Sequence, residues 1–122
     1  MSQAIEQLGQ NGAELVIIPQ ILVEFWTVAT RPKDVNGLGM TTDEAEKELE
    51  HPQKLFTLLP ENEEIFDEWK GLIVKNKVSG KTTHDARIVA AMTVHKIKNI
   101  LTLNPNDFKR FTEITAIKPQ DV

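Results

Sequence analysis

The apolar residues of this chain occur in short continuous runs separated by stretches with helical spacing. Short apolar runs are typical of strands that a parallel sheet buries on both faces, and stripes repeating every three or four positions are typical of amphipathic helices. The runs predict strands within ELVIIP (14–19), TLLP (57–60), NILTL (99–103) and EITAI (113–117). Since helical stretches alternate with these runs, the pattern predicts an α/β fold whose parallel sheet is covered by helices on both faces.

The helices are expected at residues 3–10, 19–30, 41–56, 61–77 and 82–96. Pro19 suits the first turn of the second helix, where a missing N–H costs nothing. One apolar stripe is expected along that helix, formed by Ile21, Leu22, Phe25, Val28 and Ala29. A threonine cap and early acidic residues open the third helix, and Pro52 is expected to kink or break it.

Length and composition limit the class of protein. A chain of 122 residues with 40% hydrophobic content suits one compact domain, here taken as residues 1–122. The absence of cysteine excludes disulfides and thiolate metal sites, and no apolar run approaches the roughly 18 residues of a membrane span, so we expect a cytoplasmic protein. A net charge of −4 argues against a protein that coats nucleic acid through charge alone, although it does not exclude an enzyme that acts on nucleic acid.

Polar residues follow the predicted strand at 99–103. Thr102, Asn104 and Asp107 lie at or just beyond its carboxyl end. Parallel α/β sheets bind ligands outside the carboxyl ends of their strands, so this is the edge where chemistry is expected.

Two further acids can reach the same edge. Glu24 falls beside Ile21 and Val28 at the rim of its helix's apolar stripe, and Asp85 stands in the first turn of the helix at 82–96. Three carboxylates brought together repel one another unless a cation lies among them, and all-oxygen ligands favour Mg²⁺ or Mn²⁺ over zinc. Glu24, Asp85 and Asp107 therefore predict a metal site suited to the hydrolysis of a nucleic acid backbone.

Each acid also has an ordinary structural explanation. Asp85 follows Thr82 at the spacing of a capping pair, Glu24 suits a solvated helix face, and Asp107 lies among the turn formers of NPND. Trp26 and Trp69 suit core or interface packing better than base stacking. No single acid decides between the two interpretations.

The order of these segments resembles a known family. IIPQILVEFWTVATRP, TTHDARIVAAM, ILTLNPNDFKRF and the closing ITAIKP are similar to a PIN domain, of the kind found in VapC-like ribonuclease toxins that are paired with antitoxins in bacteria. The resemblance covers residues 13–119 and implies a three-layer α/β/α fold.

The resemblance also implies roles for individual residues. A metal-dependent endoribonuclease would bind Mg²⁺ or Mn²⁺ through Glu24, Asp85 and Asp107 and cleave RNA with a metal-activated water. Supporting polar residues would be Thr83, Thr102 and Asn104. Basic residues available to meet RNA phosphates are Arg31, Lys33, Lys81 and Arg87.

One departure from the family pattern concerns the start of the chain. PIN domains open with a strand that ends in Asp, followed by Thr and Asn, whereas this sequence opens with MSQAIEQLGQNG, which resembles the helix after that strand. The first metal-binding acid and the usual first central strand are therefore expected to be missing. Each buried backbone group left unpaired would cost on the order of 1 to 3 kcal/mol. We therefore expect an N-terminally incomplete domain that compensates by closing its flanking strands or by forming a homo-oligomer.

Two functions follow as alternatives. The first is the metal-dependent ribonuclease, with RNA as substrate. The second is a catalytically impaired PIN-like module that binds an antitoxin or itself through exposed apolar surface around Trp26 or Trp69. A phosphate-accepting receiver domain fits less well, because no strand ends in the isolated Asp that its chemistry needs.

Overall fold

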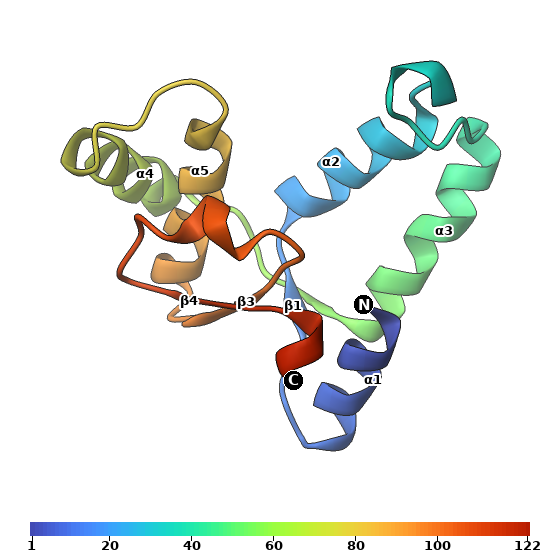
Figure 1. The fold of residues 1–122 in the computed structure, drawn as a ribbon, viewed down its shortest axis with the longest axis horizontal. Coiled ribbons are helices and arrows are strands. Elements are labelled where there is room, and N and C mark those ends of the chain that lie inside the picture. Colours follow the sequence, from blue (N-terminus) through green and yellow to red (C-terminus); the bar gives the residue numbers. More distant parts are fainter. The chain divides into compact units, whose positions relative to one another are not determined.

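The computed structural model describes all 122 residues as two compact units (Figure 1). Unit 1 comprises Met1–Glu14 and Glu61–Val122, and unit 2 comprises Leu15–Pro60. The five α-helices and the short parallel strands confirm an α/β fold, while the three-layer arrangement stays a prediction. No helix combines the length and apolar character needed to cross a membrane.

Unit 2 is a helical hairpin joined to a pair of strands. Its elements in chain order are β1 (Val16–Ile17), α2 (Pro19–Thr30), the 3₁₀ turn η1 (Lys33–Val35), α3 (Thr42–Leu55) and β2 (Thr57–Leu58). Helices α2 and α3 pack together, and Figure 1 shows η1 at the turn of the hairpin. Each helix carries one completely buried alanine, Ala29 in α2 and Ala45 in α3, which suits a close approach.

The loop after η1 closes the end of α2. The N–H groups of Leu38, Gly39 and Met40 donate to the carbonyls of Val28, Arg31 and Ala29, which would otherwise lack partners at the helix end. Gly37 lies so close to the Arg31 backbone that any side chain there would overlap it. Glycine at position 37 is therefore required by this close contact and not only by turn preference.

Unit 1 contains the larger core. Its elements are α1 (Ser2–Gln10), α4 (Glu63–Lys75), α5 (Thr82–Val94), β3 (Asn99–Leu101), η2 (Pro105–Phe108), β4 (Thr115–Ile117) and η3 (Pro119–Asp121). Helix α4 packs against α5, and α1 packs against η3 (Figure 1). The core is built from Ile65, Leu72, Ala86, Val89, Ala90, Phe108 and Phe111.

The strands form two separate parallel sheets of two strands each. In unit 2, Val16 and Ile17 pair with Thr57 and Leu58. In unit 1, the three residues of β3 pair with the three residues of β4, from Asn99 opposite Thr115 to Leu101 opposite Ile117. The strand positions and their parallel direction agree with the sequence-based prediction, although no sheet has more than two strands.

Two details of the helices differ from the prediction. Pro52 does not break α3, which continues to Leu55, and the N–H of Phe56 still donates to the Pro52 carbonyl. A proline removes one hydrogen bond from the helix, and here only the final turn follows it. Val28 was expected in the apolar stripe of α2 but is 38% exposed.

Helix α3 begins with a reciprocal cap. The Thr41 hydroxyl accepts from the Glu44 N–H at 3.1 Å, and a Glu44 carboxylate oxygen accepts from the Thr41 N–H at 3.0 Å. The hydrogen bond from the Thr41 backbone, followed by that from its side chain, lowers the pKa of Glu44. The cap fixes the start of the helix at the position predicted from the sequence.

Replacing the cap threonine tests its contribution to stability. Thr41→Ala removes the hydroxyl acceptor, so we expect the free energy of unfolding in urea to fall by about 1 kcal/mol. The matched change at the exposed turn residue Thr112, to Ala, should alter it by less than about 0.5 kcal/mol. Equal effects of the two substitutions would show that the capping box contributes nothing specific.

Candidate functional site

Asp85 lies half-buried in the first turn of α5. The chain enters this helix through Gly80, whose φ of +66° suits glycine, and the N–H groups of Thr83 and His84 donate to the carbonyls of Gly80 and Lys81. Lys81 is the N-cap residue and provides no side-chain cap, so Asp85 is the one acid close to the positive end of the helix. This position is the one that the sequence predicted.

Thr83 is fixed from two sides. Its hydroxyl donates to the Gly80 carbonyl at 2.6 Å, and its own carbonyl accepts the indole N–H of Trp69 at 3.0 Å. The second bond joins α4 to the first turn of α5. A role of the Thr83 hydroxyl in orienting a ligand stays a prediction, because the observed bond is structural.

Asp107 follows the carboxyl end of β3, as expected. Strand β3 ends at Leu101, and the Thr102 N–H extends the ladder by donating to the Ile117 carbonyl at 3.0 Å. The Thr102 hydroxyl then accepts from the Asn104 N–H at 3.1 Å, which turns the chain into η2. Asp107 is exposed in η2, while the next residue, Phe108, is 7% exposed and anchors the turn in the core.

The elements that carry Asp85 and Asp107 are neighbours. Helix α5 packs against η2 within unit 1 (Figure 1). The two aspartates are more than 20 residues apart in the sequence, and β3 lies between their elements along the chain. The two elements are therefore brought together by the fold.

Glu24 belongs to unit 2. It is exposed on α2, where the Gln20 side-chain amide donates to its Oε1 at 3.2 Å. Within neither unit do three or more His, Asp or Glu side chains form a group that could hold a metal ion. A site that combines Glu24 with Asp85 and Asp107 therefore stays a prediction.

The predicted ligand residues nevertheless have the donor atoms that the predicted ion prefers. Carboxylates are hard oxygen donors, and Mg²⁺ is commonly held by one or two of them while it keeps several waters. Asp85 and Asp107, on elements in contact, would provide such a pair. The chain contains no cysteine that would favour a softer metal.

The four predicted RNA-binding cations are divided between the units. Arg31 and Lys33 lie in unit 2, and Lys81 and Arg87 lie in unit 1. Arg87 already has an anionic partner, because its two terminal nitrogens lie 3.0 Å from the two carboxylate oxygens of Glu61. Lys81 is exposed at the start of α5.

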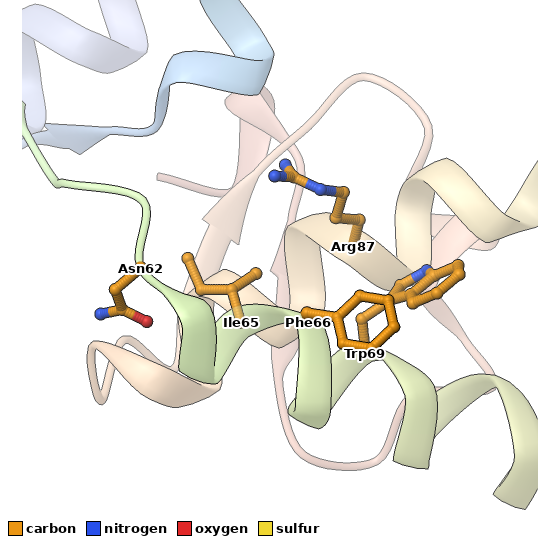
Figure 2. Close-up of a pocket in the computed structure, with 5 residues that line it drawn as sticks. All are labelled: Asn62, Ile65, Phe66, Trp69 and Arg87. Carbon is orange, nitrogen blue, oxygen red and sulfur yellow. The ribbon is translucent and has the colours of Figure 1, made fainter.

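A pocket in unit 1 was not anticipated from the sequence. It has a volume of about 210 Å³ and is lined by Asn62, Ile65, Phe66, Trp69 and Arg87 (Figure 2). The Phe66 and Trp69 rings lie 5.8 Å apart between centroids, with planes inclined by 42°. The sequence does indicate part of this pocket, because residues 62, 65, 66 and 69 share one helix face. It does not indicate the contribution of Arg87, which depends on how α4 and α5 pack.

Comparison with solved structures gives a fold similarity. The chain is similar to a chain of the structure described as VapBC-1 from nontypeable Haemophilus influenzae, with a TM-score of 0.72 and 16% identity. The alignment covers 97% of this chain and 86% of the other. No protein-family profile matches the sequence, and no curated protein sequence matches it.

The bond between Trp69 and Thr83 can be tested by removing its donor. Trp69→Phe leaves the Thr83 carbonyl without the indole N–H, so we expect the free energy of unfolding to fall by about 1 to 2 kcal/mol. Amide exchange in the first turn of α5, around Thr83 and Asp85, should also become faster.

Trp26→Phe is the matched control for this change. Trp26 is also half-buried on a helix, but no hydrogen bond of its indole is seen. We expect its replacement to leave exchange in α5 unchanged. Equal acceleration of α5 exchange in both variants would contradict the assigned role of the Trp69 indole.

Proposed function

We propose that this chain is a metal-dependent endoribonuclease of the PIN type. The observation that carries the proposal is the placement of two aspartates on contacting elements, Asp85 at the start of α5 and Asp107 directly after β3. The similarity of the fold to VapBC-1 supports it, because the sequence independently resembles VapC-like toxins.

In this proposal Glu24, Asp85 and Asp107 hold Mg²⁺ or Mn²⁺. When bound, such an ion lowers the pKa of a coordinated water and offsets negative charge on a phosphodiester. The protein contributes the positions of the carboxylates. The Trp69 bond to Thr83 fixes the turn that bears Asp85, and the Thr102 bond to Asn104 shapes the turn before Asp107.

The substrate in this proposal is RNA, whose backbone would be met by nearby cations. Lys81 is exposed immediately before α5 and is the best placed of them in unit 1. Arg87 is half-exposed and paired with Glu61, so a phosphate would have to compete with that carboxylate. Arg31 and Lys33 would contribute from unit 2.

We also propose a protein partner of the antitoxin type, acting in the cytoplasm. The name VapBC-1 of the similar structure agrees with the sequence resemblance to VapC-like toxins, which are paired with antitoxins. Association with a second copy of the chain is a further part of this proposal, since each sheet has only two strands.

The alternative is a catalytically impaired module that acts by binding protein. Large apolar side chains exposed in unit 2 favour it, and those more than half exposed are Val23, Val35 and Leu55. Exposed apolar surface of this kind is common at protein interfaces. Metal-dependent activity separates the two functions.

Cleavage of a single-stranded RNA in the presence of Mn²⁺ tests the enzyme function. Asp85→Asn keeps the size of the side chain but removes its charge, so we expect the rate to fall by at least about 100-fold, the effect of losing several kcal/mol of charge stabilisation. Mn²⁺ binding measured by calorimetry should weaken in parallel. Removal of metal with a chelator should abolish cleavage by the unmodified protein.

Asp121→Asn provides the control. Asp121 is an exposed aspartate in η3 of the same unit and has no place in the proposed site. Its replacement should leave both cleavage and Mn²⁺ affinity unchanged. Background cleavage that is the same in all three proteins would exclude the enzyme function and favour the binding module.

A further inference from the structure

Two side chains that line the pocket between α4 and α5 are already bonded within the protein. The Trp69 indole N–H is bonded to the Thr83 carbonyl, and the Arg87 guanidinium is bonded to both carboxylate oxygens of Glu61. A ligand in the pocket would meet the Phe66 ring, the adjoining Trp69 ring and the side-chain amide of Asn62. Phe66 is 59% exposed. Figure 2 shows the two rings beside one another on α4.

The segment that carries Phe66 is rich in acidic residues. Residues 61–68 contain five acids, Glu61, Glu63, Glu64, Asp67 and Glu68, and no basic residue. On a helix, Glu63 lies one turn before Phe66 on the same side, and Lys70 lies one turn after it. Glu61 remains able to accept further hydrogen bonds, because a carboxylate has about four lone-pair sites and Arg87 uses two of them.

Aromatic faces edged by carboxylates attract cations. The negative face of an aromatic ring binds a guanidinium or ammonium group, and a carboxylate can bind the same group through charge-assisted hydrogen bonds. A nucleic acid would also offer rings for stacking, but its phosphates would meet the acids of residues 61–68. Charge therefore favours a basic protein segment over RNA at this pocket.

The size of the pocket favours a single side chain. Sites for small molecules commonly measure about 300 to 1,000 Å³. At about 210 Å³ and open to solvent, this pocket suits one arginine or lysine side chain, with neighbouring apolar residues of the same segment against Phe66. An arginine fits best because its planar group can stack on a ring and bind a carboxylate at once.

We propose that the Phe66 and Trp69 pocket, edged by Glu61, is a docking site for an arginine side chain on a basic and apolar segment of a partner protein. The segment would place its guanidinium over the rings and against the outer side of the Glu61 carboxylate. This inference does not rest on RNA cleavage, because no pocket residue except Arg87 is proposed to touch the metal or the RNA.

The test uses the full chain and a short acetylated and amidated peptide of alternating arginine and leucine. Binding is followed by the indole N–H signal of Trp69 in nitrogen-15 correlation spectra, which Trp69→Phe identifies. We expect a saturable shift with the arginine peptide. The same peptide with citrulline, an uncharged analogue of arginine, should produce no saturable shift at equal concentration.

Two variants locate the binding. Phe66→Ala removes the exposed ring and should weaken peptide binding at least about fivefold, whereas Val74→Ala, at a 70% exposed position on the same helix, should not. Glu61→Gln should also weaken it. Since none of these side chains belongs to the buried core, the variants should keep the amide spectrum of a folded chain.

Three results would overturn the proposal. The first is the absence of any shift up to about 5 mM peptide. The second is an equal shift with the citrulline peptide, which would indicate apolar contact alone. The third is tighter binding of a single-stranded oligouridine than of the peptide, strengthened by Glu61→Gln, which would assign the pocket to nucleic acid.

Discussion

The most extensive packing between two elements of unit 1 is that of α4 against α5. Completely buried Ala86 and Ala90 make the surface of α5 smooth enough for a close approach. Two polar links then join the two helices. The Trp69 indole on α4 donates to the Thr83 carbonyl on α5. Glu61, which precedes the N-cap residue of α4, pairs with Arg87 on α5. The first link joins α4 to the turn that carries Asp85, and one member of each link, Trp69 and Arg87, lines the aromatic pocket.

The second constraint is the pairing of very short strands. A two-stranded sheet is marginally stable on its own, so each pair here needs support from its surroundings. In unit 1 that support comes from buried Phe108 and Phe111, which follow β3 and hold the chain between the strands in the core. Asp107 is thus exposed in the same turn as the buried Phe108.

Local signals in the sequence predicted most elements. Pro19 and Thr41 mark the starts of α2 and α3, and Gly12, at a φ of +82°, follows the end of α1. Pro52 was expected to kink or break α3, but α3 continues past it, because a proline near a helix end removes only one hydrogen bond. The positions of Asp85 and Asp107 were predictable from a helix start and a strand end. The pocket was not, since Glu61 and Arg87 are 26 residues apart and meet only through tertiary packing.

Paramagnetic broadening by Mn²⁺ tests the central claim most directly, because it acts only on nuclei close to the bound ion. Nitrogen-15-labelled protein would be titrated with Mn²⁺ while the amide signals are recorded. The account predicts that the amides of Asp85 and Asp107 lose intensity together at the lowest concentrations. Broadening that begins within the acidic residues 61–68 and leaves Asp85 and Asp107 sharp would contradict it.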